Sequence, residues 1–159
     1  MEKHPMRRAK NEISDPLIIE QLLKKASVCH MGLSDDGHPY VVPMNYGYSG
    51  GCFYLHSAGE GRKLDILSRN NQVCIEVVID YSIESADAPC NWTTNYTSVI
   101  GFGRAYILEA LEEKEKALCK LMQAFTGTPV HAFSAHSMKH VCVIRVDIDD
   151  IRAKDSTLD

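Results

Sequence analysis

The chain has 159 residues, a formal net charge of −4, 45% hydrophobic residues and 24% charged residues. This length predicts a single domain over residues 1–159 with its own core, and the negative charge argues against general nucleic-acid binding. No apolar run approaches the roughly 20 residues that a membrane span requires, and residues 1–16 lack the apolar segment of a secretory signal. We therefore expect a cytoplasmic protein without nucleic-acid or membrane partners.

The six cysteines follow neither a zinc-binding nor a thioredoxin-like pattern, because no two of them are spaced as C-x-x-C. Four of them (Cys29, Cys52, Cys74 and Cys142) lie in apolar, strand-like runs, where a free thiol behaves as a small hydrophobic side chain. We predict reduced thiols in or near the core, and a disulfide framework is the less favoured alternative.

The first third of the chain predicts a helix followed by a β-hairpin. Asp15-Pro16 supplies a capping side chain and a proline for the start of a helix that ends near Ala26. Residues 28–33 have the pattern of a strand and residues 38–48 form its return strand. The Asp-Gly sequence at residues 36–37 between them is a strong hairpin signal.

The middle of the chain predicts two strands separated by a short helix. Residues 52–56 form the third strand, and apolar residues give a buried face to a helix over about residues 61–70. Residues 72–80 alternate between apolar and polar side chains and form the fourth strand. The polar residues 81–91 predict an irregular loop that is long enough to be functional.

The last third predicts two strands around a helix. Residues 95–108 form a long strand whose two glycines indicate a bulge or a bend. A helix over residues 110–125 follows, residues 130–138 can hold a helical turn, and residues 140–147 form the final strand.

The six predicted strands are mostly joined as hairpins and are flanked by helices. This order indicates a mainly β (α+β) domain that closes into a small antiparallel barrel. The strands do not alternate one-for-one with crossover helices, which argues against a doubly wound parallel sheet. We expect residues 1–12 and 150–159 to be flexible tails.

A basic pair at the start of the second helix is the first candidate site. Arg62 and Lys63 follow the sequence Gly59-Glu60-Gly61, although basic residues at a helix start oppose the helix dipole. With the exposed N–H groups of the helix start, the two cations could hold a phosphate. The alternative is a solvated surface pair, which residue type alone favours.

The end of the preceding strand supplies two further candidates. His56 could hydrogen-bond a ligand or carry a proton, or it could be satisfied by its own loop. Ser57 could donate to a phosphate, although capping the next helix is the commoner role for serine there. Their positions alone do not choose between these roles.

Three more polar or aromatic positions could reach a ligand. Pro43 cannot donate to a strand ladder, so we expect its strand to be at an edge, bulged or open to a ligand there. Unpaired backbone groups of Pro43-Met44-Asn45 could bind a planar heterocycle, unless this is an ordinary edge protected by proline. Trp92 could stack on a ring or cover the core, and Ser98 could reach a ligand or a neighbouring strand.

A metal site is not expected. The seven histidines have no H-E-x-x-H spacing, and His131, His136 and His140 are close in sequence without a recognised ligand pattern. The chain also contains no G-x-S-x-G nucleophile motif and no catalytic cysteine signature.

Three motifs are specific in combination. They are V-V-P-x-N ending at Asn45, H-S-A-x-x-G-R-K starting at His56, and S-V-I-G-F-G-R-A starting at Ser98. Over about residues 6–150 the chain resembles the pyridoxamine 5'-phosphate oxidase-like FMN-binding proteins, nearest the nitroimidazole-resistance (Nim) type. This resemblance implies a six-stranded antiparallel split β-barrel that forms a homodimer with FMN at the interface.

The resemblance also implies which residues touch FMN, and it makes His56 the expected catalytic residue. The strand before Tyr46 would lie along the flavin ring, and the basic pair would hold the phosphate. The implied contacts are Val42, Pro43, Met44, Asn45, His56, Ser57, Arg62, Lys63, Trp92 and Ser98.

The function implied by the resemblance is an FMN-dependent oxidoreductase that reduces small molecules such as nitroaromatic or nitroimidazole compounds. One alternative is a non-catalytic flavin or haem binding protein or sensor. Another is pyridoxamine 5'-phosphate oxidation, which is less favoured because the sequence ends soon after the final strand, without the C-terminal substrate-binding segment of those oxidases.

Overall fold

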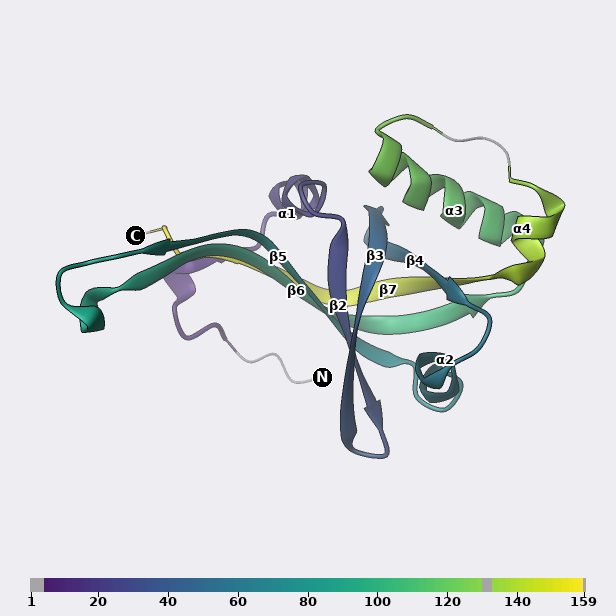
Figure 1. Ribbon diagram of the computed structural model, residues 1–159, viewed down its shortest axis with the longest axis horizontal. Helices are drawn as coiled ribbons and strands as arrows, with labels where there is room; N and C mark the ends of the chain where they lie inside the picture. The colour runs from purple at the N-terminus through teal and green to yellow at the C-terminus, as the bar shows by residue number, and fades with distance from the viewer. Residues whose placement is uncertain (1–4, 130–132, 159) are drawn as a thin grey trace.

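Antiparallel strands make up most of the computed structural model, which describes residues 5–129 and 133–158 (Figure 1). The strands are β1 (Glu12–Ile13), β2 (Val28–Asp35), β3 (His38–Ser49), β4 (Cys52–Ala58), β5 (Gln72–Glu84), β6 (Thr93–Leu108) and β7 (Val141–Asp155). The helices are α1 (Pro16–Leu23), α2 (Arg62–Leu67), α3 (Leu111–Thr126) and α4 (Ala135–His140), with 3-10 turns η1 (Ala9–Asn11) and η2 (Pro89–Asn91). The prediction of a mainly β fold with flanking helices is confirmed.

The strand pairings form a ring. Strand β7 pairs with β4, and the sequence of pairings through β3, β2, β5 and β6 then returns to β7. The short strand β1 is added to this ring by pairing with β7. The described residues therefore contain seven strands where six were predicted, because a strand of two residues shows no alternation that a sequence pattern can detect.

The ring is open between β3 and β4, and we call this opening the β3–β4 fork. The two strands pair only from Tyr46 opposite Leu55 to Ser49 opposite Cys52. Beyond this segment the two strands diverge. In the described part of the chain, residues 38–45 of β3 pair with β2 alone, and residues 56–58 of β4 pair with β7. The predicted open edge at Pro43 is thus confirmed.

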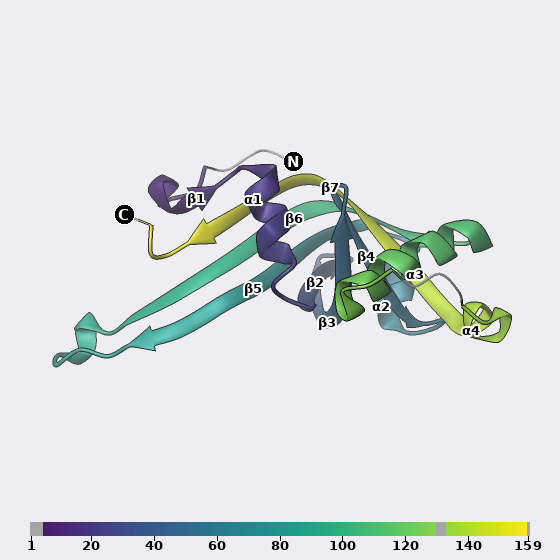
Figure 2. The same cartoon turned by 90° about the horizontal axis from the view of Figure 1, so that it is seen from above.

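Strands β5 and β6 are longer than predicted and project from the barrel as an arm (Figure 2). The prediction of an irregular loop over residues 81–91 was wrong for its first part, because β5 continues to Glu84. Tyr81 pairs with Tyr96, and Glu84 pairs with Thr93 at the end of the arm. Residues 80–84 are exposed on both faces of the strand, so they show no buried face that a sequence pattern could mark.

The final strand also extends further than predicted. Strand β7 does not end at Asp147 but continues to Asp155, so residues 150–155 do not form a flexible tail. Ala153 is fully buried opposite Val99. Ala153 is surrounded in the sequence by the charged residues Arg152, Lys154 and Asp155. The segment therefore has the composition of a solvated tail.

The N-terminal segment is likewise ordered from residue 9 onward, contrary to the expected tail over residues 1–12. The side chain of Asn11 is only 2% exposed and its amide donates to the Leu158 carbonyl. Glu12 then enters β1 opposite Lys154. These polar pairings, rather than an apolar pattern, hold the segment in place.

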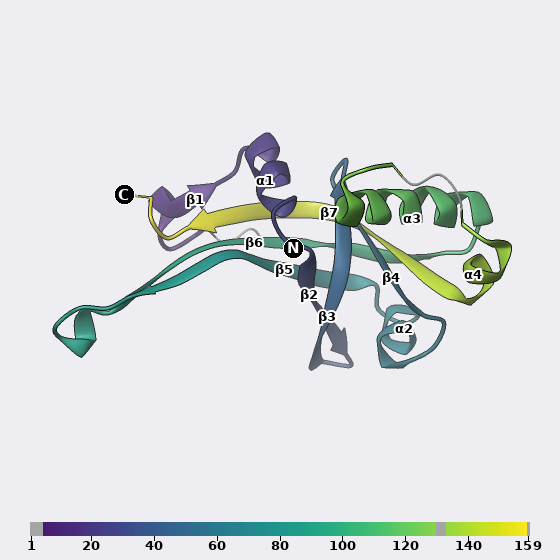
Figure 3. The ribbon, with the colours of Figure 1, turned by 45° about the horizontal axis from the view of Figure 1, so that its top comes forward.

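Two apolar clusters form the core. The larger cluster fills the barrel, and the smaller one lies under α3, which packs on β3 and β4 (Figure 3). The close approach of α3 depends on Gly47 of β3. A Cβ atom at Gly47 would lie 2.9 Å from both the Cα of Leu121 and the carbonyl oxygen of Lys120.

We therefore expect Gly47→Ala to lower the free energy of unfolding by about 1–3 kcal/mol, because the added methyl group overpacks the contact with α3. Chemical denaturation measures this change. Gly59→Ala is the matched control, since a Cβ there meets nothing within 4 Å, and its stability should stay close to that of the parent protein. Equal effects of the two substitutions would contradict the packing of α3 on Gly47.

The predicted strand positions of four cysteines are confirmed: Cys29 and Cys142 are buried, and Cys52 and Cys74 are half-buried. Burial raises the pKa of the Cys29 thiol from 9.0 to about 12. Burial is also the main cause of the raised pKa of Cys52 and Cys74. The thiolate is the reactive form, so these thiols are chemically protected in the folded protein.

At about pH 8 we expect a maleimide to modify the exposed Cys90 and to leave Cys29 unmodified until the protein unfolds, as mass spectrometry of labelled peptides can show.

The raised pKa of Cys29 also makes the stability of the protein depend on pH. As the pH rises, the unfolded chain loses the Cys29 proton at a lower pH than the folded protein does. The free energy of unfolding should therefore fall as the pH rises from about 9 to about 12. Equal labelling of Cys29 and Cys90 in the native protein would refute the buried position.

Candidate functional site

A cavity of about 350 Å³ lies in the β3–β4 fork, within the range of about 300–1,000 Å³ typical of small-molecule sites. It collects seven of the ten predicted site residues, and Arg62, Trp92 and Ser98 are not among its lining. The lining residues are Val28, Val42, Pro43, Met44, Asn45, His56, Ser57, Ala58 and Lys63.

The backbone of β3 offers polar groups to this cavity. The N–H of Tyr46 donates to the Ser27 carbonyl at 3.2 Å, on the side of β2. Backbone groups alternate between the two sides of a strand, so those of Asn45 and Pro43 face away from β2 and into the fork. Pro43 therefore occupies a position where its missing N–H costs the β2–β3 ladder no hydrogen bond.

His56 and Ser57 lie on the opposite side of the fork, in β4. His56 is exposed and has no hydrogen-bond partner within the described ranges, so both ring nitrogens are available to a ligand. The Ser57 hydroxyl donates to the Ala58 carbonyl at 2.8 Å, and its oxygen can still accept a hydrogen bond. Ser57 does not cap α2, whose N-cap residue is Gly61.

Lys63 is the cation of this cavity. It lies in the first turn of α2 and is half-buried. No carboxylate of residues 5–129 or 133–158 forms an ion pair with its amine. An ammonium group without a carboxylate partner can bind an anionic group in the cavity through a charge-assisted hydrogen bond.

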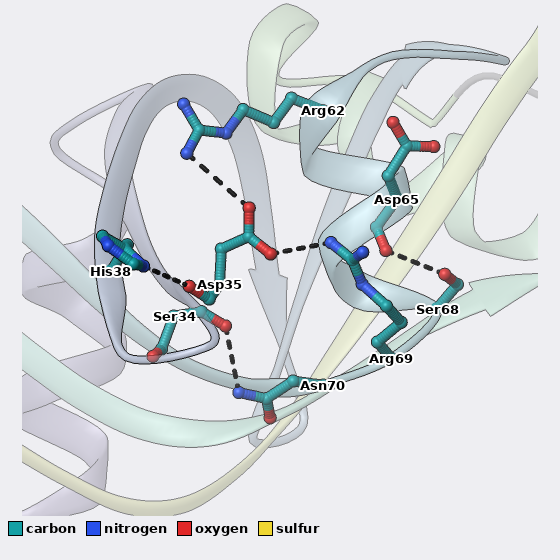
Figure 4. Close-up of polar contacts among 8 residues, drawn as sticks. All are labelled: Ser34, Asp35, His38, Arg62, Asp65, Ser68, Arg69 and Asn70. Atoms are coloured by element: carbon teal, nitrogen blue, oxygen red, sulfur yellow. Dashed lines mark hydrogen bonds and ion pairs between the residues drawn. The ribbon is translucent and has the colours of Figure 1, made fainter.

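Arg62 points to a different partner (Figure 4). Its guanidinium lies 3.6 Å from a carboxylate oxygen of Asp35 and 4.8 Å from the ring centre of Tyr40. Arg69 pairs with the other oxygen of Asp35 at 2.7 Å, and the Asn70 amide donates to the Ser34 carbonyl at 3.2 Å. Together these contacts fasten α2 to the tip of the β2–β3 hairpin, and this position of α2 places Lys63 at the cavity.

Trp92 lies on the arm and Ser98 lies in the ring of strands, and neither is at the fork. Trp92 is 55% exposed at the end of the arm, where its indole N–H donates to the Ala86 carbonyl at 2.8 Å. Ser98 is half-buried in β6, between Val78 of β5 and Lys154 of β7. Within one chain the fold does not bring these two residues to the cavity.

Two lining residues were not predicted. Val28 faces Asn45 across the β2–β3 hairpin, and Ala58 ends β4. The signal for Val28 was present in the sequence, since a two-residue turn at Asp36-Gly37 sets the register that places Val28 opposite Asn45.

No group of three or more metal-ligating side chains occurs within the described ranges; His131 lies outside them, and the side chain of His136 is likewise not described. In this part of the chain, no helix is both long enough and apolar enough to cross a bilayer.

The antiparallel ring opened between β3 and β4 defines a split β-barrel with a cavity in the split. Residues 15–155 match the family model described as pyridoxamine 5'-phosphate oxidase, and the chain belongs to this family. No curated protein matches the sequence.

Solved structures agree with this assignment. A candidate 5-nitroimidazole antibiotic resistance protein from Bacteroides thetaiotaomicron VPI-5482 is 34% identical, with a TM-score of 0.79 over 91% of this chain and 86% of that one. The flavocytochrome Anf3 from Azotobacter vinelandii (21% identity, TM-score 0.82, 97% and 73% coverage) shares the fold. So does a FAD and haem binding protein from Mycobacterium smegmatis (19% identity, TM-score 0.83, 92% and 74% coverage).

Proposed function

We propose that the protein binds FMN in the β3–β4 fork and acts as an oxidoreductase on small molecules such as nitroaromatic or nitroimidazole compounds. The observation that carries this proposal is that Lys63, which has no ion-pair partner among the described residues, lines a cavity bordered by an open strand edge. The similarity to a candidate 5-nitroimidazole resistance protein supports the choice of nitro compounds as substrates.

The lining of the cavity suits the separate parts of FMN. Lys63 would hold the phosphate through a charge-assisted contact, with Ser57 beside it. The backbone groups of Pro43 and Asn45 that face the fork would bind the polar edge of the flavin ring. Val28 and Val42 supply apolar surface for the flat faces of the ring.

Bound FMN would supply the electron transfer to a small acceptor. The chain itself would bind and orient the flavin and limit the access of water to it. His56 is the proposed catalytic residue, because it lines the cavity and its imidazole can donate a hydrogen bond to a reacting molecule or accept one from it.

We further propose a cytoplasmic homodimer with FMN at the interface. The arm exposes Tyr81, Ile83 and Trp92, at 66%, 57% and 55%, and exposed apolar surface of this kind favours a protein contact. Trp92 and Ser98 would reach a flavin only through such a contact between subunits. Light scattering during gel filtration measures the mass, and a monomer at micromolar concentration would refute the dimer.

The absorption spectrum of the purified protein, with and without added FMN, tests the cofactor. We expect flavin bands in this spectrum. In a second assay, the flavin-loaded protein should oxidise NADH or NADPH in the presence of nitro compounds taken from a panel. A colourless protein that takes up no FMN would overturn the proposal. Bound flavin without turnover would indicate a binding protein, a Soret band would indicate haem, and peroxide release with pyridoxamine 5'-phosphate would indicate the oxidase activity.

A further inference from the structure

A second cavity, of about 510 Å³, lies where the N-terminal segment meets the C-terminal end of the chain, and we call it the terminal cavity. It shares no lining residue with the cavity in the fork. In Figure 1 its segments, η1 and the end of β7, lie on the other side of the barrel from α2. The lining residues are Arg7, Arg8, Ala9, Lys10, Asn11, Ser156 and Leu158.

Three cations border the terminal cavity. Arg7, Arg8 and Lys10 are separated by at most three positions in a chain whose net charge is −4. None of them forms an ion pair with another residue in the described ranges. All three residues are exposed, and the positive charge that they place at the cavity would attract an anion.

Among the described residues, the carboxylates next in sequence to the lining residues are those of Glu12 and Asp155, and both have other partners. Glu12 lies 3.1 Å from the guanidinium of Arg152. Asp155 accepts hydrogen bonds from the N–H of Thr157 at 2.9 Å and from its hydroxyl at 2.7 Å. Neither carboxylate is therefore positioned to neutralise the three cations.

The walls of the terminal cavity are held by hydrogen bonds. The buried Asn11 joins the two ends of the chain by donating to the Leu158 carbonyl, and its N–H donates to the Arg8 carbonyl at 3.0 Å. Ser156 is fixed to β6, because its hydroxyl accepts from the N–H of Tyr96 at 2.7 Å and its N–H donates to the Tyr96 carbonyl at 3.0 Å. These hydrogen bonds attach the segment that carries the cations to the C-terminal end of the chain, and that end to β6.

We propose that the terminal cavity binds the diphosphate group of a small-molecule ligand. Arginine forks match phosphate oxygens in pairs, and Lys10 adds a third positive charge. Three positive charges can balance more negative charge than a single phosphate group carries, and the cavity has room for more than one phosphate group. This proposal does not depend on flavin binding in the fork.

Titration calorimetry of the full chain with inorganic pyrophosphate, inorganic phosphate and sulfate tests the proposal. Because Lys63 could also attract pyrophosphate, each titration is run on the parent protein and on Lys63→Ala. The test variant is Arg7→Gln/Arg8→Gln/Lys10→Gln. The matched control is Lys24→Gln/Lys25→Gln/Lys116→Gln, which removes three exposed cations elsewhere.

We expect pyrophosphate to bind Lys63→Ala and the control as it binds the parent protein, and at least about tenfold more weakly to the test variant. Phosphate and sulfate should bind about tenfold more weakly than pyrophosphate. The proposal fails if pyrophosphate does not bind, if Lys63→Ala abolishes binding, or if the control loses as much affinity as the test variant. Equal affinity for the three anions would also refute a diphosphate site.

Discussion

Lys63→Ala should weaken FMN binding by about 10- to 150-fold, because the substitution removes a charge-assisted contact worth about 1.5–3 kcal/mol. Quenching of flavin fluorescence on titration with protein measures the dissociation constant. Lys63→Arg should retain most of the affinity, since it keeps the positive charge at the same position of α2. The fold should be unaffected, because Lys63 has no ion-pair partner in the part of the chain that the structure describes.

Arg62→Ala is the informative comparison for Lys63→Ala. Because Arg62 pairs with Asp35 and lies outside the cavity lining, its removal should weaken FMN binding by less than about tenfold. It should lower the free energy of unfolding by at most about 1 kcal/mol, since Arg62 is exposed and Asp35 keeps its ion pair with Arg69. A loss of affinity as large as that of Lys63→Ala would mean that Arg62 leaves Asp35 to hold the phosphate.

Phe53→Ala should have the largest effect on stability, a loss of about 3–5 kcal/mol in the free energy of unfolding. Phe53 is fully buried at the start of β4, with its ring centre 5.2 Å from that of Tyr46 and 4.9 Å from that of Tyr48. Truncation leaves a cavity beside the only segment where β3 and β4 pair in the described chain. Denaturation monitored by circular dichroism measures the loss.

Phe125→Ala is the control for the same change of residue type. Phe125 lies in the last turn of α3 and is 39% exposed, so its truncation should cost less than about 1 kcal/mol. Comparable losses for Phe53→Ala and Phe125→Ala would contradict the packing at the base of the fork.

The sequence predicted the parts of the fold that depend on local patterns. Asp15 caps α1 by accepting from the N–H of Leu17, and Pro16 occupies the first turn of this helix. The hairpin turn at Asp36-Gly37 has positive φ at both residues, as the Asp-Gly signal predicts. Each of these features is determined by a few neighbouring residues.

Features that depend on distant partners were harder to predict. The length of the arm follows from pairing between β5 and β6, because its polar residues have no apolar pattern of their own. The same holds for the second half of β7, residues 148–155, where Ala153 is the one residue that is fully buried. Composition therefore indicated a loop and a tail where pairing forms strands.

The candidate site shows the same division. Pro43 and Asn45 could be assigned to an open edge because proline has no N–H to donate to a neighbouring strand. His56 could be placed near the end of a strand. The partner of Arg62 could not be predicted, since Asp35 is distant in sequence and meets α2 only in the folded barrel. The adjacent residues Arg62 and Lys63 look alike in the sequence, but the tertiary structure pairs Arg62 with Asp35 and places Lys63 at the cavity.

The pairings of β7 also determine the order in which the barrel can be assembled. The hairpins β2–β3 and β5–β6 join neighbouring segments and can form as soon as their residues are available. In contrast, β1 has β7 as its strand partner, and β4 and β6 each need β7 on one edge. Such distant pairings form slowly, so we infer that docking of β7 limits the folding rate and that partly folded chains expose unpaired strand edges until it occurs.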